Sequence, residues 1–399
     1  MEVTAWPAPP ATTALLYCHD TFGLGHLRRT LSLVEALHER RPDLAQLVAT
    51  GSPLAHGFRL PERVDYLKLP SVAKVGAGYA ARSLPLSLAD VMALRTEILT
   101  AAARRLRPEL VVVDNVPAGL GGELLPALRE LRRSRGTRLV LGLRDIVDEP
   151  ERVRRAWTRD GSYELLDEVY DRILVYGQPD LFDVAAEYGF SPAARAKTRY
   201  VGYVRRREPE VRGEDDRPLV LVIAGGGGDG FPLLRTALES RARAGRADLR
   251  WVVVSGPFLP AHQRDELALL ARRTPGTDLV EFVRDLPALI AGADVVVSMG
   301  GYNSVCEILS ARRPAVIVPR VEPRLEQLLR ARALERRGLV RVVHPDELTP
   351  ARLAMQVDAL LETDANEGNT VDLSGLDRAA AELESLLAGA EPAAVGGAR

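Results

Sequence analysis

Short runs of apolar, β-branched residues alternate along the chain with longer segments in which apolar residues recur every three or four positions. The first pattern is typical of buried strands and the second of amphipathic helices. Strands that alternate with helices form βαβ units, so we predict an α/β protein with two doubly wound parallel sheets. The predicted strands are 14–18, 46–50, 65–69, 110–113, 139–142 and 172–176 in the first half, and 219–224, 251–255, 279–282, 294–298, 315–319 and 340–343 in the second.

A charged segment without apolar periodicity, 205–217, separates the two halves and is predicted to be a linker. We therefore expect one Rossmann-like domain over 1–204 and a second over 218–350. Helical patterns within 351–390 either pack on the second domain or cross back to the first. The final stretch, 391–399, is expected to be a disordered tail.

Composition places the chain among ordinary globular proteins. Hydrophobic residues make up 46% of it, charged residues 27%, and the formal net charge is −1, which argues against a nucleic-acid partner. The two cysteines are too few for a disulfide framework or a zinc cluster. The first residues lack the pattern of a secretion signal, and no apolar stretch approaches the length of a membrane-spanning helix. We expect a cytoplasmic protein.

Open parallel sheets bind ligands beyond the carboxyl ends of their strands, so two such sheets that face each other predict a cleft. The stretch HDTFGLGHLRR follows the first predicted strand. Gly23 and Gly25 allow a tight turn and close approach of the backbone to a ligand. His26 then begins a helix, either as a general base or as a capping residue. Arg28 and Arg29 follow. Arg28 is a candidate for the acceptor side, although both arginines are compatible with a solvated helix face, and two adjacent helical residues are not expected both to point into the cleft.

The second half opens with LVLVIAGGGGDG, a strand that ends in consecutive glycines before a new helix. Backbone amides and the helix dipole there favour a bound phosphate, although a plain turn would have the same sequence. The residues concerned are Gly225, Gly226, Gly227 and Gly228. A third stretch, SMGGYNSVCEILS, places Ser304 and Glu307 at the spacing of a capping box, which would by itself explain both residues. The same geometry also points amides and an acidic group toward the cleft.

From Phe282 onward, FVRDLPALIAGADVVVSMGGYNSVCEILSARRPAVIVPR resembles the donor-binding half of GT-B glycosyltransferases, particularly those similar to the UDP-GlcNAc transferase of lipid II synthesis. The N-terminal glycine loop that ends in Gly-His is similar too, and its start resembles a group of predicted glycosyltransferases. The resemblance implies that Gly300, Gly301, Asn303 and Ser304 hold a diphosphate, that Glu307 binds the ribose, that Glu326 and Gln327 contact the donor sugar, and that Phe282, Val283 and Leu286 hold the base.

The implied activity is transfer of a hexose, of the GlcNAc type, from a nucleotide-diphosphate sugar to a small-molecule or lipid-linked acceptor hydroxyl. UDP is the expected nucleotide, and the reaction is expected to invert the anomeric carbon without a metal or a further cofactor. His26 would remove the acceptor proton, oriented by Asp114 or, alternatively, by Asp20. Asp145 would either face the acceptor or cap a helix. A peripheral membrane contact is compatible with this activity.

Two alternatives use the same cleft. A non-hydrolysing NDP-sugar 2-epimerase shares the architecture but needs no acceptor. A sugar-nucleotide-binding regulator would keep the cleft and lack turnover.

Overall fold

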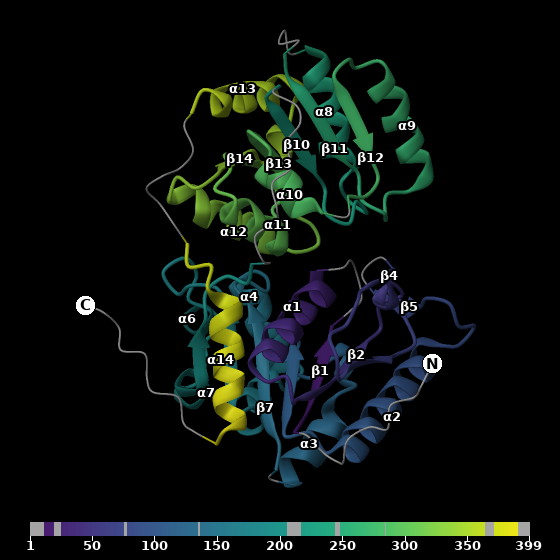
Figure 1. Cartoon of the computed structure of the whole chain (residues 1–399), viewed down its shortest axis with the longest axis vertical. Coiled ribbons are helices and arrows are strands. Elements are labelled where there is room, and N and C mark those ends of the chain that lie inside the picture. Colours follow the sequence, from purple (N-terminus) through teal and green to yellow (C-terminus); the bar gives the residue numbers. More distant parts are fainter. Residues whose placement is uncertain are drawn as a thin grey trace.

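The computed structural model describes residues 12–19, 25–75, 78–134, 136–205, 217–243, 248–283, 285–363 and 371–389. The predicted tail 391–399 and all but the ends of the predicted linker 205–217 lie outside these residues. Within them the chain forms two α/β units stacked along its long axis (Figure 1).

The first unit is built on a seven-stranded sheet in the order β3-β2-β1-β6-β7-β8-β9, in which every neighbouring pair is parallel. The order reverses between β1 and β6, which is where ligands bind in sheets of this kind. The strands are β1 (Thr13–Cys18), β2 (Ala45–Thr50), β3 (Val64–Lys68), β6 (Leu110–Asp114), β7 (Arg138–Arg144), β8 (Arg172–Tyr176) and β9 (Thr198–Tyr200).

Helices cover both faces of this sheet, and a small antiparallel hairpin, β4 (Val72–Val75) with β5 (Gly78–Ala81), lies beside it. The sequence pattern did not predict the hairpin or β9, because such short strands carry too little periodicity. The helices are α1 (Gly25–Arg40), α2 (Leu88–Leu106), α3 (Leu125–Ser134), α4 (Pro150–Arg159), α5 (Ser162–Glu164), α6 (Val184–Glu187) and α7 (Pro192–Lys197), with a π-helical turn at Leu165–Val169 and 3₁₀ turns at Ala55–Gly57 and Leu120–Gly122.

The second unit repeats the plan with a six-stranded parallel sheet in the order β12-β11-β10-β13-β14-β15. The predicted fold class, two doubly wound parallel sheets, is therefore confirmed. The elements are β10 (Leu219–Ile223), α8 (Phe231–Arg243), β11 (Arg250–Val254), α9 (Ala261–Arg272), β12 (Thr277–Val280), α10 (Leu286–Ala291), β13 (Val295–Ser298), α11 (Tyr302–Ser310), β14 (Ala315–Ile317), α12 (Glu326–Arg336), β15 (Arg341–Val342), a 3₁₀ turn at Pro345–Glu347 and α13 (Pro350–Leu361).

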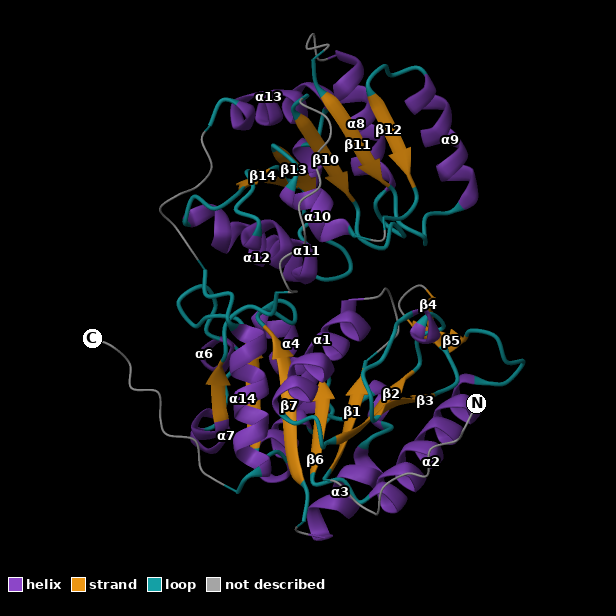
Figure 2. Cartoon of the chain, viewed as in Figure 1, coloured by secondary structure: helices purple, strands orange, loops and turns teal. Residues whose placement is uncertain are grey.

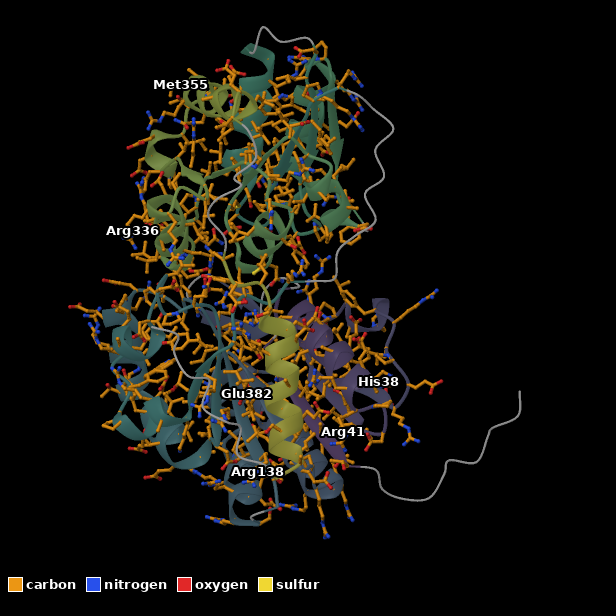
Figure 3. The ribbon with its side chains drawn as sticks, turned by 60° about the vertical axis from the view of Figure 1, so that its left-hand side comes forward. His38, Arg41, Arg138, Arg336, Met355 and Glu382 are labelled. Carbon is orange, nitrogen blue, oxygen red and sulfur yellow. The ribbon has the colours of Figure 1, made fainter. Side chains whose placement is uncertain are left out.

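The C-terminal helices separate. Helix α13 packs against α8 in the second unit, whereas α14 (Gly375–Leu387) crosses back to the first unit and lies along α1. Figure 3 shows α14, marked by Glu382, against this lower unit. Leu37 of α1 and Leu383 of α14 belong to one buried apolar cluster, and Arg40 pairs with Glu384 at 2.7 Å. The chain therefore connects the two units twice.

The carboxyl ends of both sheets face the boundary between the units, as the strand arrows show (Figure 2). Contacts across that boundary are specific. The Tyr302 hydroxyl of α11 donates to the carbonyl of Tyr176 at 2.9 Å and accepts from the N–H of Val204 at 3.0 Å. The two sheets and their loops can therefore contribute to one shared site.

Candidate functional site

A cavity of about 310 Å³ lies between the carboxyl ends of the two sheets. Residues of both units line this cavity, because the carboxyl ends of both sheets face the boundary between the units. Of the residues expected from the sequence, it is lined by Gly25, His26, Arg28, Gly225, Gly226, Gly227, Phe282, Val283, Leu286, Gly301, Asn303, Ser304, Glu307, Glu326 and Gln327. Gly228 and Gly300 belong to the same turns without lining it, and Asp20 and Gly23 lie outside the described residues.

His26, near the start of α1, lies 2.5 Å from Asp114 at the end of β6, measured from Nδ1 to Oδ2. Asp114 also accepts from Arg29, whose Nη2 is 2.5 Å from Oδ1. A carboxylate only accepts hydrogen bonds, so Nδ1 of His26 carries the proton and Nε2 is the ring nitrogen left for a ligand. The structure thus brings together the histidine and the carboxylate that the sequence analysis paired.

Charges around this pair set its protonation. Burial alone would raise the pKa of Asp114, but the neighbouring Arg29 and His26 hold it below its ordinary value. Burial lowers the pKa of His26 to about 4, although Asp114 acts in the opposite direction. The imidazole is therefore neutral at neutral pH and has a lone pair on Nε2.

The solvated-face interpretation of Arg29 is wrong, because its side chain is only 4% exposed and pairs with Asp114. Its guanidinium also lies 5.6 Å from the ring centres of Tyr176 and Tyr302. Both Arg28 and Arg29 line the cavity. Adjacent helical residues do so here because they stand in the first turns of α1, where the helix end itself faces the cavity.

The glycine loop after β10 has the geometry of a close backbone approach. Gly227 has φ +88°, and a Cβ there would lie 2.1 Å from the carbonyl oxygen of Ser255. Gly225 has φ +61° and open space where its Cβ would be. A side chain at Gly227 would clash with a neighbouring backbone, and the positive φ at both Gly225 and Gly227 disfavours any residue other than glycine. The loop leads directly into α8, and Asp229 just before this helix lines the cavity.

The capping-box explanation of Ser304 and Glu307 is wrong. Helix α11 begins at Tyr302 with Gly301 as its cap, and no side chain caps it. The first intrahelical bond runs from the Val305 N–H to the Gly301 carbonyl at 2.9 Å, so the preceding N–H groups have no intrahelical acceptor. Both Ser304 and Glu307 line the cavity instead.

Two helix N-termini meet at this point. The Asn303 side chain of α11 donates to the carbonyl of Gly25, the first residue of α1, at 3.1 Å. Each helix N-terminus carries partial positive charge, so their convergence favours an anion in the space between them.

Beyond α11, the residues expected to contact the donor sugar form a network around Arg320. Its Nη2 donates to Glu326 at 2.5 Å, and its backbone N–H donates to the side chain of Gln327 at 2.9 Å. Arg320 also pairs with Asp229 of the glycine loop at 3.1 Å. Phe282 also lines the cavity and is 53% exposed beside Val283, which suits a flat aromatic ligand.

Asp145 neither faces the cavity nor caps a helix, so both interpretations of it are wrong. It is 2% exposed and accepts two bonds from Arg330 of α12, at 2.6 and 2.7 Å. Helix α4 is capped by Glu149 instead.

Several polar residues that line the cavity were not singled out from the sequence. His19 directly follows β1 and lies next to His26, with their ring centres 5.5 Å apart. It heads the quoted stretch HDTFGLGHLRR, so its place at a strand end was an available signal. Others are Lys74, Tyr79, Arg144, Asp229, Glu281, Ser298, Tyr302, Arg320, Arg324 and Arg330.

Two features that bear on function are membrane-spanning helices and metal-binding groups of side chains. No described helix is long and apolar enough to cross a membrane. Among the same residues, no three His, Cys, Asp or Glu side chains come together as a metal-binding group.

Comparison with known proteins gives a consistent result. Residues 220–381 match the model of the glycosyltransferase family 28 C-terminal domain. The chain is 25% identical over 356 residues, 86% of each protein, to the UDP-N-acetylglucosamine--N-acetylmuramyl-(pentapeptide) pyrophosphoryl-undecaprenol N-acetylglucosamine transferase of Symbiobacterium thermophilum.

Solved structures share the fold over nearly the whole chain. A calicheamicin glycosyltransferase has a TM-score of 0.63 at 20% identity, covering 96% of this chain and 100% of its own. A putative UDP-N-acetylglucosamine 2-epimerase from Listeria monocytogenes has a TM-score of 0.65 at 13% identity, covering 96% of this chain and 98% of its own. At these identities the likeness establishes the fold, and it confirms the expected GT-B architecture.

Proposed function

This chain is a glycosyltransferase of the GT-B fold with a family 28-like C-terminal domain. We propose that it transfers a hexose of the GlcNAc type from a UDP-sugar donor to an acceptor hydroxyl, with inversion at the anomeric carbon and without a metal. The observation that carries the proposal is the His26–Asp114 pair, at 2.5 Å, beside two converging helix N-termini in one cavity. The acceptor is a small molecule or a lipid-linked one.

The donor lies along the second unit in this proposal. Its base rests against Phe282 and Val283, its ribose hydroxyls are bound by Glu307, and its diphosphate lies between the glycine loop and the start of α11. The support is that these residues line one cavity and that residues 220–381 match a family 28 domain. UDP-N-acetylglucosamine also appears in the name of the Symbiobacterium relative.

The sugar occupies the space next to Glu326. One oxygen of this carboxylate, Oε1, accepts from Arg320, whereas Oε2 has no hydrogen-bond partner among the described residues. The Glu326 side chain is buried and lines the cavity. A buried acceptor without a partner costs free energy, which a sugar hydroxyl would recover by donating to it.

In the reaction, the acceptor oxygen attacks the anomeric carbon of the donor from the face opposite the diphosphate. The new bond to the acceptor forms as the bond to the diphosphate oxygen breaks, and the electron pair leaves with UDP. His26 takes the hydroxyl proton on Nε2, and Asp114 stabilises the resulting imidazolium through Nδ1. Single inversion at the anomeric carbon follows from this one displacement.

The leaving diphosphate is stabilised by groups that this chain itself supplies. Backbone amides at the start of α11 and in the glycine loop donate to its oxygens, and the positive ends of α1 and α11 favour its charge. Arg320, held by Asp229 and Glu326, also lines the cavity and adds positive charge there. These groups are the support for a reaction that needs no divalent cation.

A thermal-shift screen of UDP, dTDP and GDP sugars tests the donor assignment, because a ligand that binds only the folded state raises the unfolding temperature. We expect UDP-N-acetylglucosamine to stabilise the protein and Glu307→Gln to reduce that stabilisation. The donor assignment would be overturned if UDP-N-acetylglucosamine stabilised the wild type and Glu307→Gln equally. It would also be overturned if no nucleotide sugar raised the unfolding temperature of the wild type. Analysis of the sugar product then separates transfer from epimerisation, since an epimerase changes the donor without releasing UDP.

A further inference from the structure

Three cations from both units line the cavity, and we refer to Lys74, Arg144 and Arg324 as the cationic rim. They come from separate parts of the chain: the β4–β5 hairpin, the end of β7 and the loop before α12. The hairpin lies on the side of the first unit that faces the second (Figure 2). None of the three forms an ion pair with a carboxylate among the described residues.

Nearby carboxylates are already engaged by other arginines. Asp229 and Glu326 pair with Arg320, at 3.1 and 2.5 Å. Glu281 pairs with Arg264 at 3.0 Å. Glu326 also attracts Lys74 and Arg144, but its ion pair is with Arg320, so this one carboxylate does not balance the three charges of the cationic rim.

Arg144 is positioned by a residue with an unusual backbone. Its Nε donates to the side chain of Asn115 at 3.2 Å, and Asn115 has φ +67°. Asparagine is one of the few residues that tolerate this left-handed conformation, and such outliers cluster at functional sites. The partner is a neutral amide, so it orients the guanidinium without neutralising it.

The positive charges of the cationic rim repel one another and the other arginines nearby. Burial together with Arg324 and Arg320 lowers the pKa of Lys74. Burial together with Arg29, Arg330 and Arg324 lowers the pKa of Arg144 to about 10. Like charges held together in a half-buried place cost free energy that an anion would recover.

The cationic rim borders the proposed base. Arg144 lowers the pKa of both His26 and His19, and Arg324 lowers that of His19, so these charges act on the same small space. His19 is 7% exposed and lines the cavity, and its Nδ1 has no hydrogen-bond partner among the described residues. This buried, unpartnered nitrogen is a second feature that points to a polar ligand.

We propose that the cationic rim binds a carboxylate or phosphate on the acceptor, close to the hydroxyl that is glycosylated. This inference rests on the proposed function, because the space between His26 and the donor sugar is where an acceptor must lie. The anion pairs with Lys74, Arg144 and Arg324, while the attacking hydroxyl lies within reach of His26. Acceptors without such a charge are disfavoured, since they displace water from the cavity while the three positive charges of the cationic rim stay unbalanced.

The test compares three probes that differ in charge: glucose, glucuronate and glucose 6-phosphate. Their binding to the full chain is measured by ligand-observed NMR, with and without saturating UDP. The variants are the single Arg324→Gln and the triple Lys74→Gln, Arg144→Gln, Arg324→Gln. The matched control is Arg104→Gln, which removes a positive charge from an exposed ion pair on α2 outside the cavity.

We expect the wild type and Arg104→Gln to bind one of the anionic probes about tenfold or more tightly than glucose. A preference for glucuronate assigns a carboxylate, and a preference for glucose 6-phosphate assigns a phosphate. The triple variant should lose the preference, and Arg324→Gln, which should fold normally, should lose about threefold or more of it. The UDP dissociation constant should change less than about twofold, because none of the three residues is among those proposed to hold the base, ribose or diphosphate.

Equal binding of glucose and both anions by the wild type would overturn the inference. A loss of UDP affinity in the triple variant that exceeds its loss of anion preference would overturn it too, and would assign the cationic rim to the donor. Failure of the wild type to bind UDP would instead count against the proposed function, and the anion preference without UDP would still be measured.

Discussion

Arg330 of α12 and Asp145 at the end of β7 form a buried bidentate ion pair across the boundary between the two units, with bonds of 2.6 and 2.7 Å. The same guanidinium donates from Nη1 to the carbonyl of Gly300 at 3.2 Å. Gly300 precedes α11, where the donor diphosphate is proposed to bind. One side chain therefore joins the contact between the units to the turn that precedes α11.

Asp145→Ala should lower the free energy of unfolding by about 3–5 kcal/mol, because it leaves a buried arginine without its counter-charge. Urea unfolding measures the change. Asp180→Ala is the matched control: Asp180 also pairs with an arginine next to α12, Arg337, at 2.6 Å, but this pair is exposed. Its loss should cost about 1 kcal/mol or less. Equal costs for both variants would contradict a special role for the buried pair.

His26→Ala should lower the turnover number by about 10²- to 10⁴-fold, the usual contribution of a general base, and leave UDP affinity nearly unchanged. His38→Ala, further along α1 and outside the cavity, should retain wild-type activity. Initial rates of UDP release and calorimetric UDP titration give the two quantities. Turnover of His26→Ala within about threefold of the wild type would remove its role as the base.

The pH dependence of kcat/KM should reveal the lowered pKa of His26. A base must be neutral to accept a proton, and the pKa of about 4 keeps it neutral well below the ordinary histidine range. We expect activity to persist as pH falls through 6.5 and to be half lost only near pH 4. Asp114→Asn removes the charge that opposes the effect of burial, so it should move this acid limb to still lower pH. An acid limb near pH 6.5 would contradict the account.

Glu307→Gln should weaken UDP binding about tenfold, since the amide keeps the shape but loses the stronger charge-assisted acceptance from ribose hydroxyls. Because α11 is capped by Gly301 and not by a side chain, the substitution leaves helix capping unchanged. Thermal unfolding without nucleotide is measured in parallel, because the buried Glu307 also takes part in an interaction within the protein. Unchanged UDP affinity would show that the ribose lies elsewhere.

The sequence predicts the strands of both sheets closely, because fully buried parallel strands are short apolar runs. It also pairs His26 with Asp114, because both follow from strand ends and helix starts at the same sheet edge. It misses the burial of Arg29, since a charged residue on a helix has the same pattern whether it faces solvent or a buried carboxylate. The partner of Asp145 lies 185 positions away, and no local spacing indicates such a contact.

The sequence pattern also failed to predict the short β4–β5 hairpin and the place of Lys74 in the cavity wall. Four-residue strands carry little periodicity, so the sequence placed no element there, although the hairpin supplies part of the cavity wall. The catalytic and binding roles of the cavity residues stay predictions until they are measured.

The most direct test of the central claim is NMR of the sugar that the protein releases from UDP-N-acetylglucosamine when water replaces the acceptor. The account predicts UDP release together with the β anomer as the first product, opposite to the α linkage of the donor, and loss of this release in His26→Ala. Initial release of the α anomer, conversion of the donor to its 2-epimer without UDP release, or undiminished release by His26→Ala would contradict it.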